Sequence, residues 1–188
     1  MKYDKAITVL RAVRYYRQPK QDSVEDYRNS YIATCAMAVK FLLPDALSNC
    51  SADREYLEIC KKHGDSVYFD THAKALREVN TIGIYTSEAR QSDILSEIDF
   101  GSPVGLRVSQ AGPCSAPSGG GHWILGIGHT PIHLIVHDPI GEVDMFEGGY
   151  KNLQRGKFMY YLWEELLVRW AVEGPGNGQM MKYRAIKP

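Results

Sequence analysis

The sequence predicts an α+β fold in which helices come first along the chain and an antiparallel sheet follows. Two observations carry this prediction. Residues 31–43 form a nearly continuous apolar run with helix signals at both ends, and from residue 102 onward β-branched and aromatic runs alternate with glycine and proline. Because the chain has 188 residues, we expect one domain spanning 1–188 with a substantial core.

The stretch NSYIATCAMAVKFLLP, residues 29–44, predicts the central helix. Its apolar residues go nearly all the way round the helix, which is typical of a buried element. Asn29 or Ser30 can cap the first turn, and Pro44 favours an end at the residue before it.

The other elements follow from periodicity and turn residues. Residues 5–17 fit either a helix or a strand, and residues 18–29 predict a loop. Three more helices are predicted, at 52–63, 70–80 and 92–99. Strands are predicted at 102–110, 121–130 and 133–139. Trp163 and Trp170 are spaced to share one face of a further helix.

Charge and hydropathy exclude some functions. Lys plus Arg and Asp plus Glu number 22 each, and no basic block is present, so we expect no nucleic-acid partner. Residues 1–18 carry a charge at every third or fourth position and contain neither a signal-peptide core nor a membrane-spanning segment. We therefore expect synthesis in the cytoplasm and no membrane partner.

The cysteines and histidines predict no metal or cofactor. Cys35 and Cys60 lie in apolar surroundings, and no CxxC pair occurs, so we expect free thiols, with a Cys50/Cys60 disulfide as the alternative. His129, His133 and His137 suggest a metal cluster, but no cysteine or acidic residue falls at ligand spacing. We expect surface or strand-edge histidines instead.

His122 and Asp138 are the first candidates for catalysis. His122 enters one predicted strand and Asp138 leaves the next, so a hairpin between them brings both to the same end of the sheet. A carboxylate beside an imidazole can fix its tautomer and hold it as a base. Such a pair is more often two strand-end polar residues, unless a nucleophile lies at a nearby helix N-terminus. Ser30 lies at the predicted helix tip, whereas Cys35 lies more than a turn inside on an apolar face.

Several motifs carry a family resemblance. SYIATCAM, residues 30–37, resembles the CGPTSLAM or CNVTSLAM motif of papain-like cysteine peptidases of the bacteriocin-processing (double-glycine leader peptidase) family. The catalytic cysteine of that motif falls on Ser30. Three further stretches are similar to the family patterns GxPV, GGHWVVVxG and VxDPxG, namely GSPVGLRV, GGHWILGIG and VHDPIGEV. Residues 161–179 are similar to the tail of phage-associated members.

The resemblance implies a papain-like fold, with a helical half around a buried central helix packed on an antiparallel sheet. It places Ser30 at the nucleophile position, His122 as general base and Asp138 as the acid that orients it. A glutamine upstream of the nucleophile donates to the oxyanion in the family. We choose Gln21 for this role, with Gln18 as the alternative. The implied reaction is amide hydrolysis through an acyl-enzyme, without a cofactor.

Ser30 in place of cysteine has three explanations: an engineered replacement, which we favour, a natural loss of activity, or a serine nucleophile activated by His122. Cys35 as nucleophile is a fourth. A hydroxyl is much less acidic than a thiol, so the exchange usually removes most of the activity.

The resemblance further implies a phage peptidoglycan hydrolase, either an endolysin or a virion-associated lysin, that reaches the cell wall by lysis or on a virion. Two alternatives remain. One is a peptidase that processes a leader or virion protein, and the other is a catalytically inactive binding or structural module.

Overall fold

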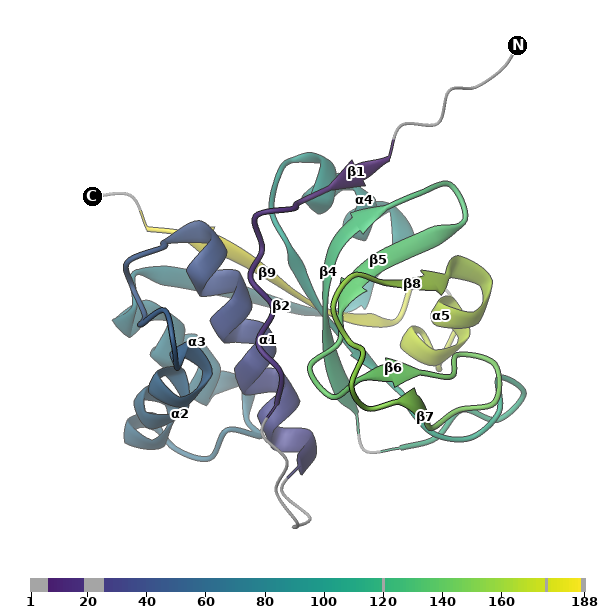
Figure 1. Ribbon diagram of the computed structural model, residues 1–188, viewed down its shortest axis with the longest axis horizontal. Coiled ribbons are helices and arrows are strands. Elements are labelled where there is room, and N and C mark those ends of the chain that lie inside the picture. Colours follow the sequence, from purple (N-terminus) through teal and green to yellow (C-terminus); the bar gives the residue numbers. More distant parts are fainter. Residues whose placement is uncertain (1–6, 19–25, 120, 175, 187–188) are drawn as a thin grey trace.

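A computed structural model describes residues 7–18, 26–119, 121–174 and 176–186 and confirms the α+β class. In Figure 1 the helices of the N-terminal half lie on one side of the molecule and most of the strands on the other. These helices are α1 (Asp26–Leu42), α2 (Ala52–His63) and α3 (Phe69–Glu78). Two shorter helices, α4 (Gln91–Asp99) and α5 (Trp163–Trp170), accompany the strands.

The main sheet has the strand order β2-β9-β3-β4-β5-β8, and its neighbouring strands are antiparallel. Its strands are β2 (Thr81–Ala89), β3 (Val104–Val108), β4 (His122–His129), β5 (His133–His137), β8 (Met159–Leu162) and β9 (Gly178–Ala185). The short β1 (Thr8–Val9) pairs with β4. A separate ribbon is formed by β6 (Glu142–Val143) and β7 (Tyr150–Asn152).

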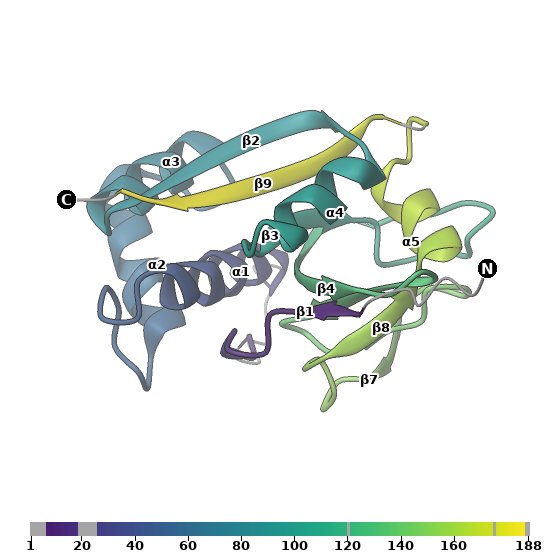
Figure 2. The same ribbon diagram turned by 90° about the horizontal axis from the view of Figure 1, so that it is seen from above.

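Both faces of the sheet are covered, which gives two apolar cores. The alternation of side chains along β4 shows how. Trp123 and Leu125 belong to the core that contains residues of α1, α2 and α3, whereas Ile124 belongs to the second core, together with Ile94 of α4 and Leu166 of α5. Figure 2 shows α1 and α2 below the long β2 and β9 strands, with α4 and α5 on the side away from α2.

Helix α1 is the buried central helix that the sequence predicts. Residues 31–40 are all buried, and Ala36 and Ala38 are fully inaccessible. The predicted start was wrong, because α1 begins at Asp26. Apolar periodicity starts only at Tyr31 and therefore does not mark the polar first turn. Ser30 is consequently not a cap but a residue one turn inside the helix.

The other predicted elements are largely confirmed. Helix α2 has the predicted bounds, and α3, α4, β3, β4 and β5 overlap their predicted ranges. Helix was the wrong alternative for residues 7–17, where only β1 is regular and the rest lacks regular secondary structure. The sequence analysis missed β2 and β9, and also the shorter β6, β7 and β8. Strand β2 lies at the sheet edge with Ile82 and Ile84 exposed, and its Gly83 and hydroxyl residues weaken the strand signal.

Leu125 tests how strongly the sheet depends on the helical half. Its side chain is fully buried in the core beneath α1, so Leu125→Ala should lower the free energy of unfolding by about 2–5 kcal/mol. Leu153 is 43% exposed, and Leu153→Ala is the matched control, expected to change it by less than about 0.5 kcal/mol. Urea denaturation of both variants measures the difference. Equal midpoints would contradict the assignment of Leu125 to the core.

Candidate active site

The hairpin of β4 and β5 brings His122 and Asp138 together at one end of the sheet. Leu125 pairs with His137, so Asp138, the next residue, lies beside the start of β4. The Nε2 atom of His122 is 2.7 Å from Oδ1 of Asp138, and both side chains are fully buried. A carboxylate accepts this hydrogen bond, so Nε2 carries the proton and Nδ1 of the neutral ring carries the lone pair.

Asp138 accepts hydrogen bonds from several surrounding groups. Besides the imidazole, Oδ1 accepts from the backbone N–H groups of Ile140 (3.1 Å) and Gly141 (3.3 Å). The Tyr161 hydroxyl donates to Oδ2 at 2.9 Å and itself accepts from the Val143 N–H. Burial raises the pKa of Tyr161, with Asp138 as a second cause, so this hydroxyl stays a donor. These bonds offset the free-energy cost of burying the carboxylate and fix its orientation.

Tyr150 of β7 packs against the imidazole from another side. The two ring centroids are 6.0 Å apart in an edge-to-face arrangement with an interplanar angle of 78°. Burial raises the pKa of Tyr150, and the nearby Asp138 raises it further. The ring restricts the positions that the imidazole can adopt.

Ser30 lies next to the residue that follows His122. Its Oγ accepts a hydrogen bond from the Trp123 N–H at 3.1 Å, and the Thr34 hydroxyl donates to the Trp123 carbonyl oxygen at 3.3 Å. The Tyr31 ring stacks on the Trp123 indole with centroids 4.1 Å apart and an angle of 6°. Helix α1 is thus fastened to β4 at Trp123, with Ser30 on the side of His122.

Ser30 and His122 are neighbours without a hydrogen bond between them. Nδ1 of His122 is buried and has no hydrogen-bond partner among the described residues. Ser30 is fully buried in α1, one turn from the helix start, rather than at the predicted tip. The amide groups that lack partners within the helix therefore belong to the turn before Ser30.

An extended N-terminal strap, residues 10–18, runs along the exit of β5. The Tyr15 hydroxyl donates to the Asp138 carbonyl oxygen at 3.0 Å, and the Gln18 N–H donates to the Pro139 carbonyl oxygen at 2.8 Å. The Gln18 side chain is buried. Gln21, which we chose for the oxyanion, lies outside the described residues. Gln18, the alternative, lies within the described residues, and its backbone is bound to the residue after Asp138.

A second cysteine–histidine contact lies in the helical half. Nδ1 of His72 is 3.6 Å from the Cys35 Sγ and 3.2 Å from the Tyr56 hydroxyl, while Nε2 donates to the Ser66 carbonyl oxygen at 2.8 Å. Burial raises the pKa of the Cys35 thiol and lowers the pKa of His72 to about 4. These directions are opposite to those of a thiolate–imidazolium pair. Cys35 is a buried core residue, as the sequence predicts.

The remaining histidines and cysteines form no site. His129 contacts Asp99, and His137 is buried between the Val13 carbonyl oxygen and the Phe158 N–H. No group of metal-ligating side chains is found among the residues that the structure describes. All four cysteines are free thiols, so the alternative Cys50/Cys60 disulfide is not formed. Nor is any helix in the described part of the chain long and apolar enough to cross a membrane.

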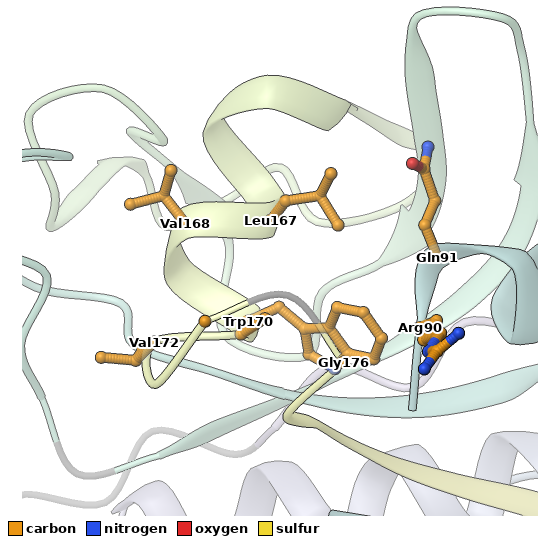
Figure 3. A pocket seen from close by; sticks show the side chains of 9 residues that line it. Arg90, Gln91, Leu167, Val168, Trp170, Val172 and Gly176 are labelled. Atoms are coloured by element: carbon orange, nitrogen blue, oxygen red, sulfur yellow. The ribbon is translucent and has the colours of Figure 1, made fainter. Parts of the chain in front are cut away.

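A polar groove of about 500 Å³ opens beside Gly121, the residue before His122. It lies between the ends of β2 and β3 and the start of β9, with Arg107 and Gln179 joined by a 3.3 Å hydrogen bond in its wall. A separate apolar pocket lies between α5 and the start of α4 and has Leu167, Trp170 and Arg90 in its lining (Figure 3). None of its lining residues is a predicted site residue.

Sequence reasoning missed Tyr150 and Tyr161, which both touch the dyad. Tyr161 belongs to the C-terminal segment that carries the resemblance. On β8 it shares a face with the buried Met159, and this period-2 pattern could have marked it as inward-facing. Tyr150 follows two glycines on a very short strand, and no local pattern distinguishes it from a loop tyrosine.

Comparison with known proteins identifies the fold. Neither a protein-family model nor a curated protein matches the sequence. The crystal structure of a protein described as a C39-like peptidase from Bacillus anthracis matches with a TM-score of 0.59 and 12% identity, covering 97% of this chain and 100% of its own. The peptidase domain of Streptococcus ComA, a bi-functional ABC transporter of a quorum-sensing pathway, matches with a TM-score of 0.56 and 16% identity, covering 92% and 99%.

A plant enzyme shares the same architecture. The Carica candamarcensis cysteine protease, solved in complex with E-64, matches with a TM-score of 0.52 and 12% identity, covering 96% of this chain and 99% of its own. At these identities the likeness shows the fold. The fold is papain-like, as the sequence resemblance implies.

The buried His72 predicts a loss of stability in acid. Burial lowers the pKa of His72 to about 4 in the folded protein, from about 6.5 when exposed. Its contribution to the free energy of unfolding is therefore complete above about pH 6.5 and lost as the pH falls toward 4. At about pH 5 the loss should reach about 2 kcal/mol. In His72→Gln this contribution disappears, whereas that of His137 remains in both proteins. Urea denaturation from about pH 7 to 5 should give the variant the shallower slope; parallel slopes would refute the prediction.

Proposed function

We propose that the chain carries the site of a cysteine-peptidase-type amide hydrolase whose nucleophile position holds Ser30. The observation that carries the proposal is the state of His122. Its Nε2–H is bound to Asp138, while its buried Nδ1 has no partner in the described part of the chain. An unpaired buried acceptor costs free energy and is typical of a site that waits for a nucleophile or a substrate. The shared fold with cysteine peptidases supports the same interpretation.

In the proposed reaction, the side chain at position 30 attacks the carbonyl carbon of the substrate amide. Nδ1 of His122 takes the nucleophile's proton and returns it to the leaving amine, so that the C–N bond breaks and an acyl-enzyme forms. Water then attacks the acyl group by the same route and frees position 30. Asp138 stabilises the imidazolium through the bond to Nε2.

Serine at position 30 weakens this mechanism. Its Oγ accepts the Trp123 N–H and makes no bond to Nδ1 of His122, so proton transfer has no preformed path. Whether evolution or an experimenter placed the serine, the chemical consequence is the same. We expect the chain to be inactive or weakly active as it stands, and Ser30→Cys to restore activity.

We further propose that the substrate is peptidoglycan and that the protein acts as a phage endolysin or virion-associated lysin. The support is the resemblance of residues 161–179 to the phage-associated tail. This range contains the end of β8, all of α5 and the start of β9. The groove includes Gly121, the residue before His122, and is lined by side chains that can hydrogen-bond a peptide, among them Ser109, Asn177 and Gln179. On this proposal the protein is made in the cytoplasm and reaches the wall by lysis or on a virion. A leader or virion protein is the alternative substrate.

The second candidate function is an inactive peptide-binding or structural module. Ser30, His122 and Asp138 are all fully buried, and the Ser30 hydroxyl is already bound to β4. These contacts favour a residue that fastens α1 to the sheet over one that reacts.

Zymography on purified peptidoglycan separates these candidates. Ser30→Cys should clear the gel, whereas the unchanged chain should clear weakly or not at all. His122→Ala added to Ser30→Cys should lower the rate by about 10²–10⁴, because the general base is lost.

The other outcomes are also informative. If both forms fold and neither clears peptidoglycan, the lysin proposal fails, and cleavage of a peptide library by Ser30→Cys then tests the alternative peptidase. If no peptide is cut, the protein is a module of the second kind. Clearing that survives His122→Ala would refute the proposed base.

We also propose that Gln18, rather than Gln21, donates to the oxyanion. The Gln18 N–H donates to the carbonyl oxygen of Pro139, the residue after Asp138, and the Gln18 side chain is buried, which supports this choice. In the Ser30→Cys background, Gln18→Ala should lower kcat by about 10²–10³ with little change in KM. Gln21→Ala is the matched control and should stay close to the parent. The reverse order of effects would restore our original choice of Gln21.

A further inference from the structure

Arg169 of α5 is a fully buried cation whose guanidinium binds only backbone carbonyl oxygens. Its donors reach the carbonyl oxygens of Met145 (2.7 Å), Ser109 (3.0 Å), Ala111 (3.1 Å), Gly112 (2.7 Å) and Phe146 (3.4 Å). Among the described residues no carboxylate contacts it. Burial of an unpaired guanidinium is costly, so this set of carbonyl oxygens must be held close together for Arg169 to be tolerated.

The carbonyl partners belong to two loops that are far apart in the sequence. The first loop, residues 109–121, connects β3 to His122. The second loop, residues 144–149, connects β6 to Tyr150. Arg169 therefore joins the segment that delivers the imidazole to the segment that delivers the ring packed against it.

Backbone hydrogen bonds within the first loop connect the residues that Arg169 binds to the end of the loop near His122. Ala111 and Ser118 exchange backbone hydrogen bonds of 2.8 Å in both directions, which folds the loop back on itself. The Arg169 carbonyl oxygen also accepts from the Ser109 N–H at 2.9 Å. Ser118 is thereby fixed four residues before His122.

The second loop acts on both members of the dyad. Tyr150 contacts the imidazole of His122 directly. Val143, at the other end of the loop, donates its N–H to the Tyr161 hydroxyl that binds Asp138. The two loops also touch each other, because the Gly149 N–H donates to the Gln110 carbonyl oxygen at 2.7 Å.

We infer that Arg169 is a positioning residue that holds His122 and Asp138 in register by clamping these two loops. Its five N–H groups form a planar fork that a lysine ammonium cannot reproduce. The effect of Arg169 on catalysis rests on the proposed function, whereas its effect on the geometry of the dyad does not.

Arg169→Lys tests the inference through the His122–Asp138 hydrogen bond. The lysine keeps the charge but loses most of the carbonyl contacts, so the dyad should open more often. NMR should show the Nε2 proton of His122 exchanging with water about tenfold faster. Arg54→Lys on α2 is the matched control, since Arg54 is exposed and remote from both loops, and should leave the exchange rate unchanged.

Gly148→Ala provides a second route that leaves Arg169 intact. Gly148 has a φ of +83°, and a Cβ there would clash with the Gly112 carbonyl oxygen, so the variant should loosen the same pair of loops. Faster exchange of the His122 proton in this variant supports the inference. If Arg169→Lys fails to fold, Gly148→Ala decides the question.

In the Ser30→Cys background, both variants should lower kcat by about ten- to a hundredfold with a nearly constant KM, because a displaced dyad impairs chemistry more than binding. Folded variants whose proton exchange matches that of the parent would overturn the inference. If Ser30→Cys itself is inactive, the proposed function fails, and the exchange measurement still decides the role of Arg169.

Discussion

Trp123 connects the two halves of the molecule, and the geometry of the candidate site depends on this connection. Helix α1 binds both backbone polar groups of Trp123, through Ser30 and Thr34, and stacks Tyr31 on its indole. Because His122 precedes Trp123 on β4, these contacts also set the position of α1 relative to the imidazole. A rotation of α1 by one residue would move Ser30 away from the strand and break all three contacts together.

The two halves of the molecule contribute different parts of the candidate site. Trp123 packs in the core with α1, His122 binds Asp138 and contacts Tyr150, and Tyr161 binds Asp138. The nucleophile position thus comes from the helical half and the base from the sheet. Burying a carboxylate at such a junction requires several donors, and the turn after β5 supplies two of them from its backbone. The turn after β5 therefore helps to hold Asp138 in place beside His122.

The sequence predicts those features that arise from local patterns. Apolar periodicity locates α1, and strand signals on either side of a short turn are sufficient to bring His122 and Asp138 together. The start of α1 is not predicted, because its first turn is polar. Contacts between distant segments leave no local pattern either, so the packing of Tyr150 and the carbonyl partners of Arg169 are found only in the structure. Gln18 illustrates the same limit, since its place beside Pro139 depends on a strap without regular secondary structure.

The buried histidines show why we place the candidate site at His122. Both ring nitrogens of His72 have partners, and so do both ring nitrogens of His137. The polar atoms of these two rings are therefore fully paired within the core, and burial lowers the pKa of each to about 4. Among the residues that the structure describes, His122 has a partner on Nε2 only, although its side chain is just as inaccessible. A fold held together only by packing would gain stability by pairing or replacing this nitrogen, so the unpaired Nδ1 supports the proposal that this atom takes part in chemistry.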